Sequence, residues 1–424
     1  MSFLNRLLGG GIESPSASVS GTADPASWLI DLFGGMVTAT GLRVGVREAM
    51  TVPSIASCVQ VLSEDIAKVP LILYKRKRGG GRERAVNHPL YRILKERPAP
   101  WMSSFMWRRL TVSTACQHGN AFARVHRDFA GRVARIQPLP HGSTVMRWAG
   151  DGEPFFDISL NGQRETGLSY RDVIHLPYRA SNDGTSNGGI FGHSPIAMHR
   201  EAIALAVATE RFGAKYFANG ARPSAIIELD GKLPNDEVAA RIRASIERTY
   251  SGVDNAGRVA ILELGMKLKE VSSKNDQSQY SEVREFQAEE MARIYRVPPH
   301  KIGLLRRSTN NNIEHQAIEY VTDAVSPIAA AFEQQLTIPL LSELEQEDYF
   351  IEFELDGLLR GDIQSRYRAY SLGRQWGWLN VDEIREMENR NALPDGAGQE
   401  FLKPLNMAKA GSDPAQNNQE NQNA

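Results

Sequence analysis

Histidines and acidic residues are the side chains through which this chain would bind a metal or transfer protons. His193 and His199 lie six residues apart, so they do not share the i, i+4 helix face that zinc proteases use. The nine histidines are scattered along the chain, which is typical of hydrogen-bonded structural residues. Glu201, Glu289 and Glu290 fall in amphipathic patterns and are expected on solvated helix faces. A two-metal site built from distant carboxylates stays open, but no pattern points to one, and we expect no catalytic residues, metal or cofactor.

Three polar segments are further candidates for a binding role. The stretch 183–192 holds four glycines but lacks the Gly-Lys-Ser/Thr ending of a phosphate loop, so we interpret it as a flexible loop. The stretch 304–312 (LLRRSTNNN) is polar and contains the adjacent arginines Arg306 and Arg307. Residues 75–84 carry six basic side chains and one acidic side chain, a pattern that favours a solvated hairpin tip over a DNA contact.

The overall composition restricts the class of partner. Lys and Arg number 49 against 50 Asp and Glu, a net charge of −1, which argues against tight binding of nucleic acid without excluding weak or local contact. Cys58 and Cys116 are too few for a disulfide framework or a zinc site, and they fit a reducing cytoplasm. No apolar run reaches the length of a membrane span, and the first residues lack a signal peptide pattern, so a soluble protein that is not exported is expected.

The elements that would position these residues begin with a mixture of helices and strands, which indicates an α+β unit. A chain of 424 residues is too long for one compact core. Apolar residues recur at intervals of three and four residues between Ile55 and Val69, as in an amphipathic helix that ends at Pro70. Residues 1–50 and 409–424 are predicted to be largely disordered. The other expected elements of this part are helices at 88–94 and 105–116 and strands at 71–78, 121–128, 133–140, 143–148, 155–160 and 172–178.

Two long helical patterns enclose a short insert in the middle of the chain. The first begins with Ser194 as N-cap and Pro195 at the first helical position and runs uninterrupted to Gly220, about 25 residues. The second begins at Asp276 and stops before the Val-Pro-Pro of 297–299. The enclosed segment has strand, helix and strand patterns of its own at 224–229, 235–252 and 258–264, so we predict an antiparallel stalk with a small cap. The apolar residues expected to pack in this stalk are Phe212, Tyr216, Val283 and Phe286.

The last third of the chain is predominantly helical. A helix from Ile313 must bend or break at Pro327 before it continues to about Leu344, because proline removes a backbone hydrogen bond. Residues 349–356 alternate as in a strand. Asn380 and Glu383 form the N-terminal signature of a short helix.

Six groups of short segments, in order and at sensible spacing, carry a resemblance to a known family. They are 52–59 with 69–71, 118–122 with 127–128 and 131, 172–176 with 192–196, 217–220, 294–299, and 378–385. From about Thr51 to Met407 the chain resembles the HK97-type portal proteins of tailed bacteriophages. It departs from the family's usual Gly-Asn-Ala-Tyr in having Phe122 at the last of these positions.

The resemblance implies an α+β portal fold with a wing, an antiparallel helical stem, a small α/β clip, a kinked tunnel helix and a helical crown. Its regions in this sequence would be an arm at 1–50, the wing at 51–193, stem helices at 194–220 and 276–299, the clip at 221–275, the tunnel loop at 300–312, the tunnel helix with a wing strand at 313–359, the crown at 360–408 and a tail at 409–424.

The resemblance also implies function and partners. A homo-oligomeric ring, commonly of twelve subunits, would sit at one capsid vertex of the virion after assembly in the host cytoplasm, in contact with the major capsid protein and with no membrane. Double-stranded DNA would pass non-specifically through its channel along the tunnel loop residues Arg306, Arg307, Ser308, Thr309, Asn310, Asn311 and Asn312. Terminase and the head–tail adaptor would dock on the clip, for which the candidate residues are Asp236, Arg241, Arg243, Glu247 and Arg248.

Two other classes of protein are alternatives to this interpretation. A terminase-like packaging enzyme predicts a Gly-Lys-Ser/Thr loop, which the sequence lacks, and nuclease carboxylates. A capsid-shell or adaptor protein without a channel is the third alternative. The near-neutral charge favours a channel, because firm phosphate contacts would slow the release of DNA.

Overall fold

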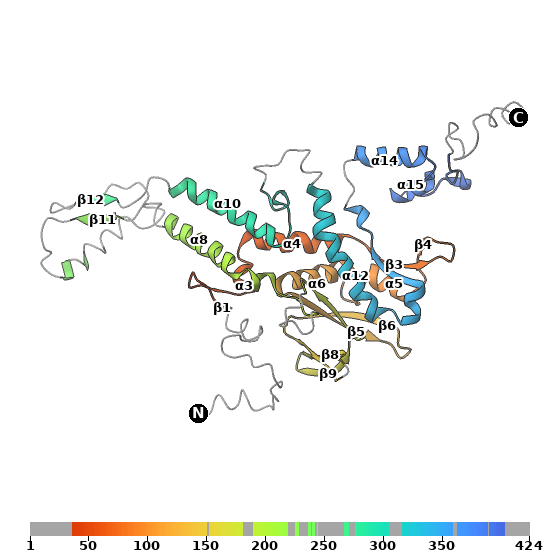
Figure 1. The fold of residues 1–424 in the computed structure, drawn as a ribbon, viewed down its shortest axis with the longest axis horizontal. Helices are drawn as coiled ribbons and strands as arrows, with labels where there is room; N and C mark the ends of the chain where they lie inside the picture. Colours follow the sequence, from red (N-terminus) through yellow and green to blue (C-terminus); the bar gives the residue numbers. More distant parts are fainter. Residues whose placement is uncertain are drawn as a thin grey trace, which may run out of the picture. The chain divides into compact units, whose positions relative to one another are not determined.

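The computed structural model describes residues 36–402 except 151, 181–189, 219–224, 229–235, 239, 242–243, 245–266, 271–275, 305–315, 359–362 and 389. It divides into two units, residues 1–354 and 355–424, which are described separately (Figure 1). Helices and strands are mixed, as the sequence predicted. Within the described part of the chain, every helix is too short or too polar to cross a bilayer.

Two helices form the centre of the first unit. α4 (Pro53–Lys68) packs against α6 (Ser104–His118), and the apolar face predicted for α4 is buried. Trp107 of α6 is fully buried, with its ring centroid 5.6 Å from that of Phe332 on α12 (Ser326–Leu340). Burial of such large aromatic side chains contributes strongly to stability, so this contact ties the C-terminal part of the unit to its N-terminal helices.

A three-stranded sheet joins segments that are distant in sequence. β3 (Leu71–Arg76) pairs antiparallel with β4 (Arg82–Arg84) on one side and with β13 (Tyr349–Phe353) on the other. Its basic side chains pair with acidic ones: Lys77 Nζ lies 3.7 Å from Glu83, and Arg84 donates to Glu354 at 2.8 Å. These exposed pairs agree with the solvated hairpin that the sequence favoured.

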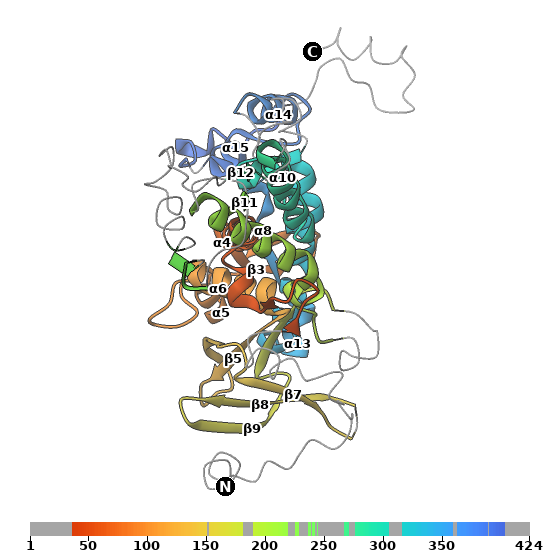
Figure 2. The same cartoon turned by 90° about the vertical axis from the view of Figure 1, so that its left-hand side faces the viewer.

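Two further sheets lie beside each other in the first unit (Figure 2). β5 (Asn120–Arg127) is flanked by β6 (Val133–Leu139) and β10 (Val173–Pro177), and β8 (Pro154–Leu160) by β7 (Thr144–Trp148) and β9 (Gln163–Ser169). A small apolar cluster fills the space between them, with members Leu139, Met146, Phe156, Ile158 and Val173. β9 was not predicted, because its sequence is polar and it is exposed along nearly its whole length.

The last part of the expected N-terminal arm, residues 36–50, contains regular structure, whereas residues 1–35 lie outside the described residues. β1 (Met36–Val37) and β2 (Arg43–Val44) form a hairpin, and α3 (Val46–Ala49) follows. The backbone N–H of Ala39 donates to Glu201 Oε2 at 3.0 Å, which attaches this hairpin to α8 (Arg200–Ala218).

The predicted stalk consists of α8 and α10 (Asp276–Ile294), which run antiparallel side by side (Figures 1 and 2). Ser194 is the N-cap of α7 (Pro195–Met198), as expected. The expected uninterrupted helix is wrong in one respect: the backbone leaves the helical region at His199, with φ of −107° and ψ of 23°, so α7 and α8 are separate. Helical periodicity does not register a change of dihedral angles at a single residue.

The insert of the stalk contains one described antiparallel pair, β11 (Ala225–Glu228) with β12 (Lys267–Glu270). The first strand agrees with the prediction. The predicted second strand at 258–264 lies outside the described residues, and β12 follows it. Helical residues within 236–244 correspond to part of the expected helix at 235–252.

The predicted bend near Pro327 takes the form of a π-helical segment. Residues 316–320 are helical, Val321–Val325 form the π segment, and α12 continues to Leu340. The helix ends earlier than the expected Leu344, because Ser342 caps a new helix, α13 (Glu343–Asp348), through a capping box with Glu345.

The second unit contains the helices α14 (Ile363–Gln375) and α15 (Val381–Met387), which are connected by hydrogen bonds from Arg366 and Tyr370 to Glu388. The predicted N-terminal signature is confirmed. The Asn380 N–H donates to Glu383 Oε2 at 2.9 Å, and the Glu383 N–H donates to Asn380 Oδ1 at 2.8 Å.

Candidate functional site

The foot of the stalk, where α6, β10 and α7 meet, brings together three segments that carried the resemblance. Gly119 ends α6 with a left-handed backbone, φ +83°. A Cβ atom there would lie 2.5 Å from the carbonyl carbon of His193, and a Cβ on Gly192 would overlap the oxygen of Gly119. Only glycines allow the two backbones to approach this closely.

Asn120 binds the same segment through both ends of its amide. Its Nδ2 donates to Gly192 O at 2.7 Å, while its Oδ1 accepts from Gly192 N at 2.8 Å and contacts His175 Nε2 at 2.8 Å. Because Oδ1 can only accept, His175 carries its proton on Nε2. Burial lowers the pKa of His175 to about 3, so the ring is neutral at neutral pH. Asn120, His175 and the Gly192 backbone therefore provide hydrogen-bond partners for one another in this buried position.

Ser194 connects the first turn of the stalk to α6. Its Oγ donates to Gln117 O at 2.7 Å and accepts from the Ala197 N–H at 3.3 Å. One hydroxyl thus caps α7 and holds it against α6.

The returning helix α10 is held at its end by two side chains. Tyr295 is buried and its hydroxyl donates to Cys116 O at 3.3 Å. Arg179 donates to Ile294 O at 2.6 Å, which satisfies a carbonyl in the last turn of α10. Arg179 has a φ of +66°, a strained conformation for a residue with a side chain. The same residue lies close to the start of the stalk, since its carbonyl accepts from His193 N at 3.3 Å.

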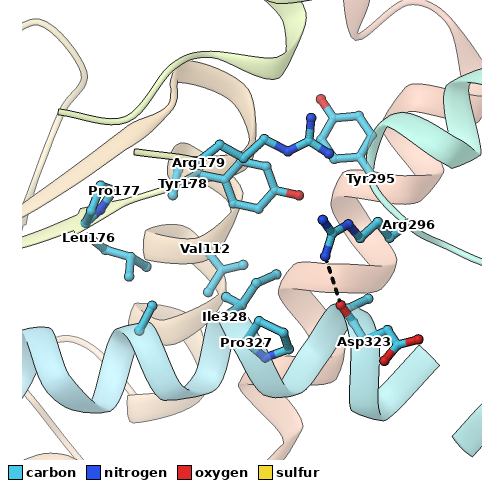
Figure 3. A pocket seen from close by; sticks show the side chains of 13 residues that line it. Val112, Leu176, Pro177, Tyr178, Arg179, Tyr295, Arg296, Asp323, Pro327 and Ile328 are labelled. Carbon is cyan, nitrogen blue, oxygen red and sulfur yellow. Dashed lines mark hydrogen bonds between the residues drawn. The ribbon is translucent and has the colours of Figure 1, made fainter. Parts of the chain in front are cut away.

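Arg296 links the end of α10 to the bent helix. Its Nη1 donates to Asp323 O at 3.4 Å, the carbonyl four residues before Pro327. In a regular helix that carbonyl would accept from the N–H that proline lacks. Figure 3 shows this hydrogen bond at the edge of a pocket of about 170 Å³, which Tyr178, Tyr295 and Pro327 also line. Its φ of +55° turns the chain between α10 and the following segment.

The seam between α8 and α10 is polar. Gln287 Nε2 donates to Thr209 Oγ1 at 3.0 Å, and a Cβ on Gly213 would overlap the hydroxyl of Tyr280. Three of the four predicted packing residues are largely exposed in the single chain. Phe212, Val283 and Phe286 are 65%, 45% and 53% exposed, and the side chain of Tyr216 lies outside the described residues.

The cysteines and the acidic residues singled out in the sequence lie in environments that do not favour reactivity. Burial raises the pKa of each thiol, Cys58 and Cys116, to about 12, so both stay protonated and unreactive at neutral pH. Glu201 binds the Ala39 N–H. Over the ranges that the structure describes, no three histidine, cysteine or acidic side chains lie close enough to hold a metal ion.

Several predicted site residues fall outside the described part of the chain. These are Arg306, Arg307, Ser308, Thr309, Asn310, Asn311, Asn312, Arg243, Glu247 and Arg248. Asp236 and Arg241 are described and exposed. Sequence reasoning did not identify Arg179 as a helix-capping residue, because a positive φ has no sequence signal at an arginine. Arg296 was part of the resemblance through the 294–299 segment, but without a role.

The chain is similar to known phage proteins in sequence and in fold. The chain matches the family model described as phage portal protein over residues 53–389. It is 35% identical over 391 residues to the probable portal protein of Streptomyces phage phiC31, covering 90% of this chain and 83% of that protein. It is 26% identical over 353 residues to the portal protein of Enterobacteria phage HK97, covering 82% and 80%. A solved chain from the neck of a native gene transfer agent particle, computed with C12 symmetry, has a TM-score of 0.53 at 20% identity, covering 82% of this chain and 95% of that one.

Proposed function

Because the chain belongs to the phage portal protein family, we propose that it forms a closed ring of identical subunits at one capsid vertex of a tailed phage. Double-stranded DNA would be packaged and ejected through the central channel of this ring. Twelve subunits are the common number implied by the resemblance, and the C12 symmetry of the similar neck structure supports it. The role is structural and needs no catalytic residue.

The observation that carries this proposal is the outward apolar face of the stalk. Leu205 and Phe212 on α8 are seven residues apart, which places them on one face, and they are 52% and 65% exposed. The opposite face of the helix buries Ile203 and Val207. A polar seam inside the stalk and apolar residues outside it indicate that a further surface covers α8.

The other stalk helix repeats this arrangement. Val283 and Phe286 lie three residues apart on α10 and are also about half exposed. Two different apolar faces on neighbouring helices suit a heterologous contact, in which α8 of one subunit meets α10 of the next. Contacts of this kind close into rings when the rotation between subunits permits.

The regions expected from the resemblance provide the rest of the proposal. The stalk corresponds to the stem, its insert to the clip, and the second unit to the crown. The clip would bind terminase and later the head–tail adaptor, the wing would contact the major capsid protein, and the tunnel loop would face the DNA. The balanced charge of the chain suits a channel that passes DNA without retaining it.

Negative-stain electron microscopy of the purified protein tests the proposal. We expect rings with a central hole, and native mass spectrometry should give one subunit number. Monomers that hydrolyse ATP would instead support the packaging-enzyme alternative, and closed shells or small oligomers without a hole would support a capsid or adaptor role.

A further inference from the structure

The described residues of the second unit include no fully buried apolar side chain. Within the described part of 355–402, apolar side chains are at most partly buried. The first unit, in contrast, buries more than fifty hydrophobic residues, alanines included. A unit of this size is marginal even with a normal core, and units that lack one depend on disulfides, metals or association.

The contacts that hold α14 to α15 are mostly polar. Glu388, just after α15, accepts from Arg366 at 3.1 Å and from Tyr370 at 3.0 Å. The side chain of Leu379 lies against the backbone of Gly373, and Leu379, Val381 and Ile384 are partly buried. The Arg366–Glu388 pair is mostly buried, with side chains 22% and 15% exposed, so it fixes the arrangement of the helices. It does not replace the burial of apolar surface, from which a folded unit draws most of its stability.

Large exposed apolar side chains of the unit lie on two surfaces. Tyr367 and Leu372 on α14 are 46% and 49% exposed, and five helical residues separate them by about 140°. Beyond the end of α14, Trp376 and Trp378 are 43% and 74% exposed. Gly377, between the two tryptophans, packs against the carbonyl of Leu402, so the C-terminal end of the described chain adds to this second surface.

The charges of the two helices are complementary. α14 carries three arginines and no acidic residue, whereas α15 carries three acidic residues and one arginine. Positive and negative surfaces on the same unit attract each other when copies meet head to tail. Two separate apolar surfaces likewise fit a heterologous contact between identical units, in which each surface meets the other one on a neighbour.

We propose that the hydrophobic core of the second unit is formed between copies: the Leu372 and Trp376–Trp378 surface of one subunit packs on the Tyr367 surface of its neighbour. The unit is then stably folded only in the assembled ring. This inference rests on the proposed ring, but it adds that assembly and folding of this unit are coupled.

Hydrogen–deuterium exchange of the full chain, with ring and monomer fractions separated by size, tests this coupling. Peptides covering 363–387 should exchange at least about tenfold more slowly in rings than in monomers. The variant Trp378→Ser with Leu372→Ser should still form rings through the first unit, yet lose that protection. Trp101→Ser is the matched control, because Trp101 is 62% exposed on the first unit, and it should leave exchange in 363–387 unchanged.

The outcomes separate the inference from the proposed function. Equal protection in monomers and rings would mean that the exposed side chains are covered within a single chain. Rings whose 363–387 peptides exchange rapidly would mean that these side chains stay uncovered in the assembly. Either result overturns the inference while the ring stands. Absence of rings at every protein concentration would contradict the proposed function, and the inference with it.

Discussion

Arg296 donates a hydrogen bond to the backbone carbonyl of Asp323, the carbonyl that Pro327 deprives of its helical partner. The arginine comes from the segment after α10 and the carbonyl from the π segment before α12. The end of the stalk and the bend of the following helix are therefore connected by one side chain.

Replacing Arg296 should loosen this connection. Arg296→Ala removes the hydrogen bond and keeps a side chain at positive φ, so the free energy of unfolding should fall by about 1–2 kcal/mol. Arg296→Gly should cost less, because glycine accepts the left-handed backbone. Arg293→Ala is the control, since Arg293 is 67% exposed and makes only weak contacts, 4.0 Å from Glu289 and 5.9 Å from the centre of the Phe286 ring. Urea denaturation gives these values, and equal losses for all three variants would contradict the assigned role.

The close backbone contact at the stalk foot can be tested with a matched pair of glycines. Gly119→Ala should destabilise the protein by more than about 3 kcal/mol, because both the positive φ and the contact with His193 oppose a side chain. Gly131 has a similar φ of +76° but no atom within 4 Å of a built Cβ, so Gly131→Ala should cost only about 1 kcal/mol. Similar thermal unfolding midpoints for the two variants would show that the close approach is unimportant.

The apolar faces of the stalk should govern assembly. Phe212→Asp and Phe286→Asp each place a charge on a surface that we propose to be buried between subunits, so ring yield in native mass spectrometry should drop. The exposed side chains leave the monomer little affected, and its circular dichroism should be unchanged. Normal ring yield for both variants would contradict the proposed contact.

Charge reversal on the clip should affect packaging before assembly. Arg241→Glu together with Arg243→Glu alters the proposed surface for terminase and adaptor, so packaged DNA should decrease while ring yield is retained. Arg78→Glu, an exposed reversal in the turn after β3, is the control and should leave packaging unchanged. If the double variant forms fewer rings, but the rings that do form package DNA normally, the clip has a purely structural role.

The tunnel loop arginines should act on DNA through charge alone. Arg306→Ala with Arg307→Ala should leave rings intact but change packaged genome length or retention, with an effect that fades as salt rises. Arg306→Lys with Arg307→Lys keeps the charge and should behave as wild type. If the arginines instead form bidentate pairs with acidic residues of a neighbouring subunit, the lysine variant should fail as well. Wild-type retention of DNA at low salt by the alanine variant would exclude the loop from DNA handling.

Features that depend on a few neighbouring residues could be predicted from the sequence. The capping box of Asn380 and Glu383, the Ser194 cap and the amphipathic face of α4 are encoded within about one helical turn, and all three are confirmed. The arrangement of two helices around an insert follows from the same local patterns. The family resemblance also rests on short segments in order, and the comparisons confirm it.

Only the tertiary structure decided which of these segments meet. β13 pairs with β3 across about 280 residues, and the polar strand β9 exists because β8 offers it backbone partners. Arg179 and Arg296 have a positive φ, and their side chains reach carbonyls of distant segments; no local pattern records either feature. Likewise, periodicity showed that Phe212 and Phe286 lie on apolar helix faces, but not that the seam within the subunit excludes them. A pattern reports that a side chain must be buried, whereas its partner is chosen by packing between elements that are distant along the chain.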